Sequence, residues 1–95
     1  MLFHVRMNVQ LPASMPVEEA ARLKADEKAL AQRLQEEGAW RHLWRIAGQY
    51  ANVSIFDVES NDELHELLSG LPLFPFMDIE VTPLATHPSD VAVSG

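Results

Sequence analysis

The chain has 95 residues, of which 47% are hydrophobic, and these values are typical of one globular domain. Its formal net charge is −7, which argues against a nucleic-acid surface and against polybasic attachment to a membrane. It contains no cysteine, which excludes disulfides, thiolate metal sites and cysteine nucleophiles.

The first predicted element is a strand from Leu2 to Leu11, in which apolar and polar residues alternate. Pro12 ends this strand, and a short loop leads to a helix that begins near Pro16. The helix is expected to run to about Glu37 and to stop at Gly38, because glycine is common just after a helix C-terminus.

The core-facing stripe of this helix contains a carboxylate. The stripe advances by three or four residues at a time and consists of Ala20, Leu23, Glu27, Leu30 and Leu34. A carboxylate on a buried face is costly to ionise unless it is paired, so its pKa usually shifts upward. Glu27 is therefore a candidate general base near neutral pH. The alternative is structural: Glu27 reaches the edge of the core, or pairs with Lys24 or Lys28.

Two strands are predicted next, from Trp40 to Ala47 and from Tyr50 to Val58. Gly48 and Gln49 between them suit a two-residue hairpin turn with glycine first. The second predicted strand places Trp40 and Trp44 on one side of the sheet and Leu43 on the other.

A second helix is predicted to begin after Ser60, since Ser60 and Glu63 form a capping box, and to end at Gly70. The last strand is expected from Phe76 to Val81. Residues 83–95, rich in proline and serine, are expected to form an extended C-terminal tail without a core of its own.

This order of elements predicts an α+β protein with the ferredoxin-like βαββαβ arrangement, in which one four-stranded antiparallel sheet carries two helices on one face. Residues 1–95 are expected to form a single domain. The predicted strands carry apolar residues on both faces, and two helices cannot cover both. We therefore expect a homo-oligomer that associates through the sheet face or its edges.

Other polar residues are candidates for binding. Tyr50 and Asn52 share a face of the third strand, and both can donate hydrogen bonds to an oxygen that gains negative charge, although ordinary sheet surface is the alternative. Arg41, His42 or Arg45 can hold a small anion by charge-assisted hydrogen bonds. The four histidines show no metal-ligand spacing, so no metal is expected.

Several segments resemble the muconolactone delta-isomerases. They are MLFHV at 1–5, HLWRIAG at 42–48, YAN at 50–52 and PLFPFMDIEV at 72–81, and the likeness extends from Met1 to about Asp90. Val53 and Phe76 depart from it, since many relatives are expected to have tyrosine at these positions. The resemblance implies a ferredoxin-like fold, a homodecamer with active sites near subunit contacts, and an enzyme that needs no cofactor.

The activity implied by this resemblance is the conversion of muconolactone to 3-oxoadipate enol-lactone in the β-ketoadipate pathway of catechol degradation. Glu27 would then act as the base, and Tyr50 and Asn52 would orient the substrate or stabilise its dienolate. The candidates for binding the acetate group of the substrate are Lys24, Arg41, His42 and Arg45.

Two other functions remain open from the sequence. One is a dehalogenating relative that acts on 5-chloromuconolactone, and the other is a ferredoxin-like ligand-binding module without catalysis. The N-terminus lacks signal-peptide anatomy, and no apolar run approaches the roughly 18 residues of a membrane span. A cytoplasmic protein is therefore expected.

Overall fold

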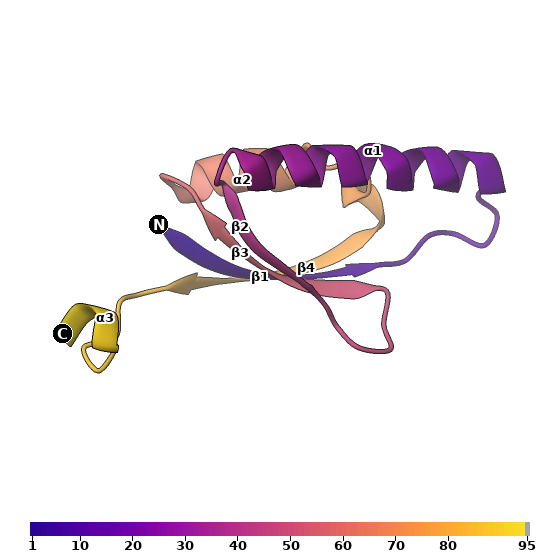
Figure 1. Ribbon diagram of the computed structural model, residues 1–95. Coiled ribbons are helices and arrows are strands. Elements are labelled where there is room, and N and C mark those ends of the chain that lie inside the picture. Colours follow the sequence, from indigo (N-terminus) through magenta and orange to yellow (C-terminus); the bar gives the residue numbers. More distant parts are fainter. Residues whose placement is uncertain (95) are drawn as a thin grey trace.

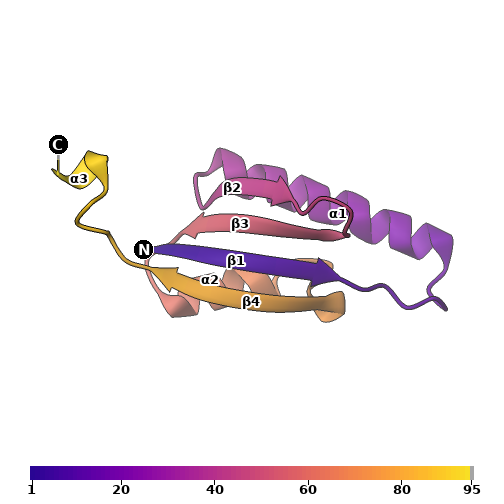
Figure 2. The same ribbon diagram turned by 90° about the horizontal axis from the view of Figure 1, so that it is seen from below.

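The computed structural model describes residues 1–94 and shows a four-stranded antiparallel sheet with both longer helices on one face (Figure 1). In sequence order the elements are β1 (Leu2–Val9), α1 (Val17–Glu36), β2 (Trp40–Arg45), β3 (Ala51–Asp57), α2 (Asn61–Ser69), the 3₁₀ turn η1 (Phe74–Phe76), β4 (Met77–Leu84) and α3 (Val91–Ser94). The strands lie in the order β2-β3-β1-β4, and Figure 2 shows them from the face that no helix covers. The predicted ferredoxin-like fold is confirmed.

The helix boundaries follow from local chemistry. Gly38 lies just after the C-terminal end of α1. Its φ of 88° is a backbone conformation that glycine adopts more readily than other residues, and it directs the chain away from the helix. At the start of α2 the Ser60 hydroxyl accepts a hydrogen bond of 3.1 Å from the backbone N–H of Glu63. The Glu63 carboxylate in turn accepts a 2.7 Å hydrogen bond from the N–H of Glu59, one residue before the usual partner.

The core lies between the helices and the sheet. Phe3, Val5 and Met7 of β1 alternate with half-buried residues and point toward the helices. Phe56 of β3 is fully buried, and its ring lies 4.7 Å, centroid to centroid, from the indole of Trp40. Within the described residues α1 and α2 add Ala31, Leu34, Leu64 and Leu68 to this cluster.

A bulge in β2 changes which of its residues face the helices. Trp40 pairs with Phe56, but the next paired residue of β2 is His42, opposite Ile55, so Arg41 is an extra residue. Beyond the bulge Leu43 and Arg45 face α1, whereas His42 and Trp44 stack on the other side, where Trp44 is 56% exposed. The prediction that Trp40 and Trp44 share a face is therefore wrong, because the bulge shifts the alternation by one residue.

One connection also differs from expectation. The turn between β2 and β3 is a loop over residues 46–50 rather than a two-residue hairpin. The N–H of Gln49 donates to the Ile46 carbonyl at 3.1 Å, and Gly48 has a φ of 78°, as the third residue of a type II turn does.

The last strand begins one residue later than predicted, at Met77, and ends three residues later, at Leu84. β4 continues to Leu84 because its C-terminal residues pair with the first residues of β1, down to Leu84 opposite Leu2. The segment that follows leaves the sheet, and α3 lies away from it (Figures 1 and 2). Across residues 1–94 no helix combines the length and the apolar character that a membrane crossing requires.

Candidate active site

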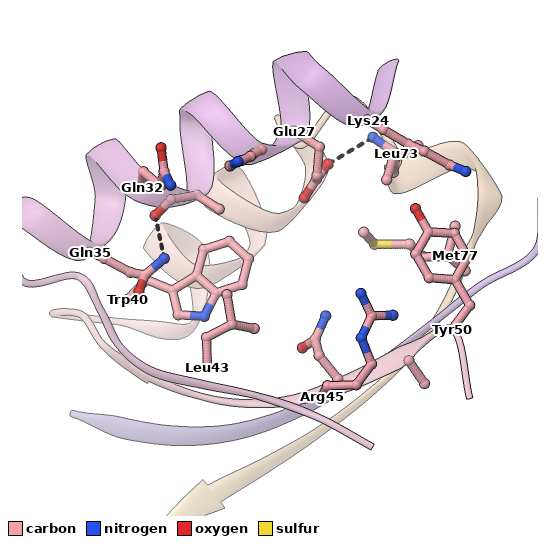
Figure 3. Close-up of a pocket in the computed structure, with 15 residues that line it drawn as sticks. Lys24, Glu27, Gln32, Gln35, Trp40, Leu43, Arg45, Tyr50, Leu73 and Met77 are labelled. Carbon is pink, nitrogen blue, oxygen red and sulfur yellow. Dashed lines mark hydrogen bonds between the residues drawn. The ribbon is translucent and has the colours of Figure 1, made fainter. Parts of the chain in front are cut away.

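A cavity of about 460 Å³ lies between α1 and the sheet (Figure 3). Its walls come from one face of α1, from β2, from the loop and strand around residue 50, and from the segment that leads into β4. The lining residues are Val9, Lys24, Glu27, Lys28, Ala31, Gln32, Gln35, Trp40, Leu43, Arg45, Tyr50, Ala51, Asn52, Leu73 and Met77. Five of the seven residues selected from the sequence are in this list.

The carboxylate of Glu27 is half-buried at the roof of the cavity. Burial raises the pKa of Glu27 above its ordinary value of 4.5, and a hydrogen bond of 2.9 Å from the backbone N–H of Leu73 to Oε1 offsets part of this rise. Within residues 1–94 neither Lys24 nor Lys28 forms an ion pair with it. The structural alternative of a paired lysine is therefore not what the structure shows, and Oε2 is left to face the cavity.

Tyr50 lies between two cations at one end of the cavity. The Nζ of Lys24 and the Cζ of Arg45 each lie 5.2 Å from the centre of the Tyr50 ring. Burial raises the pKa of the Tyr50 hydroxyl, the charge of Arg45 lowers it, and the charge of Glu27 raises it. Because the net shift is upward, the hydroxyl stays protonated and can donate a hydrogen bond at neutral pH.

The amide of Asn52 is held in one orientation by a buried neighbour. The fully buried Ser54 hydroxyl donates a 2.7 Å hydrogen bond to Oδ1 of Asn52. This interaction occupies the amide oxygen and leaves the NH₂ group as the free donor. Asn52 therefore presents a hydrogen-bond donor, rather than an acceptor, to the cavity that it lines.

Arg41 and His42 lie outside the cavity. Arg41 is the bulged residue of β2, and its Nη1 lies 3.6 Å from a carboxylate oxygen of Asp57. The ring of His42 stacks on that of Trp44, with centroids 5.1 Å apart, on the face opposite α1. The structure thus brings Lys24 and Arg45 together near Glu27 and leaves the other two predicted anion-binding residues elsewhere.

Several groups at the cavity were not identified from the sequence. The backbone N–H of Leu73 carries no signal in a side-chain pattern. The side chains of Gln32, Gln35 and Trp40 also line the cavity, and they carry no charge that would single them out as site residues. Among residues 1–94 no cluster of three or more His, Asp and Glu side chains has the geometry of a metal site.

The arrangement suits one kind of chemistry. The carboxylate of Glu27, with its raised pKa, shares one cavity with the hydrogen-bond donors of Tyr50 and Asn52 and with three cationic side chains, those of Lys24, Lys28 and Arg45. The cavity is large enough for a small organic molecule. Such a set can remove a proton from an anionic substrate and stabilise the negative charge that forms on an oxygen. The cavity therefore has the parts of a proton-transfer site for a small carboxylic acid.

Comparison with known proteins gives consistent results. The family model described as muconolactone delta-isomerase matches residues 1–90. Muconolactone Delta-isomerase 2 of Acinetobacter lwoffii is 65% identical over 91 residues, which cover 96% of this chain and 95% of that protein. The corresponding protein of Rhodococcus opacus is 57% identical and covers 95% of this chain and 97% of its own length. A crystal structure of muconolactone isomerase superposes with a TM-score of 0.92 at 65% identity, covering 96% and 95% of the two chains.

Proposed function

The chain belongs to the muconolactone delta-isomerase family, and on this premise we propose that it converts muconolactone to 3-oxoadipate enol-lactone by moving one proton. The observation that carries the proposal is the half-buried Glu27 in a cavity that is also lined by three cationic side chains, in a chain 65% identical to a named isomerase. The proposed setting is the β-ketoadipate pathway of catechol degradation, in the cytoplasm.

Substrate binding is assigned to the cationic end of the cavity. Muconolactone is an unsaturated five-membered lactone with an acetate side chain, so it carries one negative charge at neutral pH. Lys24 and Arg45 line the cavity with Glu27, and each places its positive charge 5.2 Å from the centre of the Tyr50 ring. We assign the acetate to this pair, because charge-assisted hydrogen bonds are the strong ones. The Tyr50 hydroxyl lies at the same end and helps to orient the substrate.

The reaction is a proton shift within one molecule. Glu27 removes the proton from the ring carbon that bears the acetate, and the electron pair of that C–H bond delocalises through the ring double bond onto the lactone carbonyl oxygen. Glu27 then returns the proton to the carbon next to the carbonyl, so that the double bond moves and no atom is gained or lost. The NH₂ group of Asn52 orients the ring or stabilises the dienolate.

A spectrophotometric assay tests this function against its alternatives. Purified protein is given muconolactone and, separately, its 5-chloro analogue, and both the product lactone and free chloride are followed. Turnover of muconolactone is expected. Chloride release with no turnover of the plain lactone would instead indicate a dehalogenase, and inactivity toward both would indicate a binding module.

The fall of kcat/KM at acidic pH is expected to follow the protonation of Glu27. Only the carboxylate form accepts a proton, so kcat/KM falls as the pH falls through the pKa of Glu27, which lies above 4.5. The pKa of Tyr50 is raised above 10.0, so deprotonation of its hydroxyl is not expected to reduce kcat/KM at any pH below 10. Steady-state assays between pH 4 and pH 10 would check both limbs, and an acid limb centred below 4.5 would contradict the assignment.

We also propose that the chain assembles as a homo-oligomer, the homodecamer that its resemblance implies, through the sheet face without helices. This face carries Trp44, 56% exposed, beside half-buried Val53 and Ile55. Light scattering after size exclusion is expected to show an oligomer, and Trp44→Glu is expected to yield smaller species. The control is Val17→Glu at the start of α1, where an 84% exposed side chain lies on another surface. A monomeric wild type would refute the assembly.

A further inference from the structure

Ser54 is the one polar residue among the buried residues of segment 1–94, and it is 0% exposed. The residues directly opposite it in the sheet are Val5 of β1 and Leu43 of β2, which are both apolar. A hydroxyl in such surroundings costs free energy unless it is hydrogen-bonded, and a small apolar residue at this position would avoid the cost. The hydroxyl therefore points to a role other than packing.

The hydroxyl of Ser54 has one hydrogen-bond partner within the described part of the chain. Its Oγ lies 2.7 Å from Oδ1 of Asn52, to which it donates. The backbone on both sides is occupied by sheet pairing, because β3 lies between β2 and β1. If the Asn52 amide turned over, its NH₂ group would donate to Oγ, and the hydroxyl hydrogen would be left without an acceptor in apolar surroundings. Ser54 therefore selects one of the two amide orientations.

Asn52 connects this buried hydroxyl to the cavity. Tyr50, Asn52 and Ser54 are separated by two residues each and lie on one face of the sheet, and their burial increases in that order. Tyr50 and Asn52 line the cavity with Glu27, whereas Ser54 does not. Because Oδ1 of Asn52 is directed at Ser54, the NH₂ group on the other branch of the planar amide is directed away from it and is left for a partner in the cavity.

We infer that Ser54 is a positioning residue for the isomerisation, and this inference rests on the proposed function. The lactone carbonyl oxygen gains negative charge when Glu27 removes the proton, and a hydrogen-bond donor stabilises that charge. An amide in the opposite orientation would present the lone pairs of Oδ1 to the same oxygen and repel it. By holding Oδ1, Ser54 keeps the NH₂ group of Asn52 available to the substrate, although Ser54 does not itself touch the substrate.

A double-mutant cycle of Ser54→Ala and Asn52→Ala tests this role by steady-state kinetics with muconolactone. We expect Ser54→Ala to lower kcat roughly 3- to 30-fold and to leave KM within about twofold, because the donor acts on charge that develops in the transition state. In the Asn52→Ala background the same substitution should change kcat less than about twofold, because the amide through which Ser54 acts is gone. A wild-type kcat in either single variant, or an equal loss from Ser54→Ala in both backgrounds, would overturn the inference.

Chemical denaturation of the same four proteins detects the contact without relying on turnover. Asn52→Ala leaves the buried Ser54 hydroxyl without its acceptor, so it should unfold at a lower denaturant concentration than the double variant, which lacks that hydroxyl. The opposite order would overturn the inference, as would coupling in stability without coupling in kcat, since the contact would then be structural only. A wild-type protein inactive toward muconolactone would refute the proposed function instead, and the order of unfolding would still show whether the two side chains interact.

Discussion

Replacement of Glu27 by glutamine is expected to lower kcat by roughly 10²- to 10⁴-fold, the usual contribution of a positioned general base. Glutamine has nearly the same shape and keeps a side-chain oxygen that can accept the hydrogen bond from the Leu73 N–H. It cannot accept a proton from carbon, so the chemical step is lost while substrate binding is retained. Steady-state kinetics with muconolactone would show a fall in kcat and a similar KM.

The stability of Glu27→Gln separates this interpretation from a structural one. Because the pKa of Glu27 is raised in the folded state, the folded chain binds this proton more tightly than the unfolded chain does. The ionised carboxylate therefore lowers the free energy of unfolding at neutral pH, and this penalty disappears as the pH falls to 4.5 and below. We expect Glu27→Gln to be at least as stable as wild type at pH 7 and to lose that advantage near pH 4, by chemical denaturation.

The matched control for this variant is Asp26→Asn. Asp26 is the preceding residue of α1, is exposed to solvent and does not line the cavity, yet its replacement removes the same charge from the same helix. Its kcat should remain within about twofold of wild type, as is usual for surface substitutions. Near-normal turnover by Glu27→Gln, or an equal loss in Asp26→Asn, would rule out Glu27 as the base.

Much of the fold could be predicted because the signals that specify it are local. Alternation in β1, the helical stripe that ends at Gly38 and the capping box at Ser60 each act over a few residues. The loop after β2 and the extension of β4 were not predicted. Both are set by pairing with other strands, as in the contact of Leu84 with Leu2, which periodicity along one segment cannot reveal.

The residues of the candidate site fall into the same two groups: those that a local sequence pattern reveals and those that depend on how the strands pair. Glu27 could be found because a carboxylate interrupts an apolar helical stripe. Arg45 and Arg41 could not be ranked, because the bulge that turns one toward α1 and the other toward Asp57 depends on how β2 pairs with β3. The same bulge places Trp40 and Leu43 together on the cavity wall, so a simple alternation cannot show that Trp40 contributes to the site.

Replacement of Arg45 by methionine is expected to raise KM roughly 10- to 100-fold, since hydrogen bonds to charged groups contribute about 1.5–3 kcal/mol. Methionine keeps much of the length and apolar contact of the side chain but removes the guanidinium beside Tyr50. The change should appear mainly in KM, because the acetate is held equally in the ground state and the transition state. The methyl ester of the substrate, which has no negative charge, should show little difference between wild type and Arg45→Met.

Arg41→Met is the control that isolates the local contact from the overall field. Both arginines belong to β2, and either substitution takes the net charge from −7 to −8, so any loss of long-range attraction for an anionic substrate is shared. Arg41 lies 3.6 Å from the Asp57 carboxylate and away from the cavity, so its KM should stay within about twofold of wild type. Equal increases in the two variants would mean that the effect is general electrostatic steering. A large increase in Arg45→Met alone, abolished with the methyl ester, requires a direct contact between Arg45 and the substrate carboxylate.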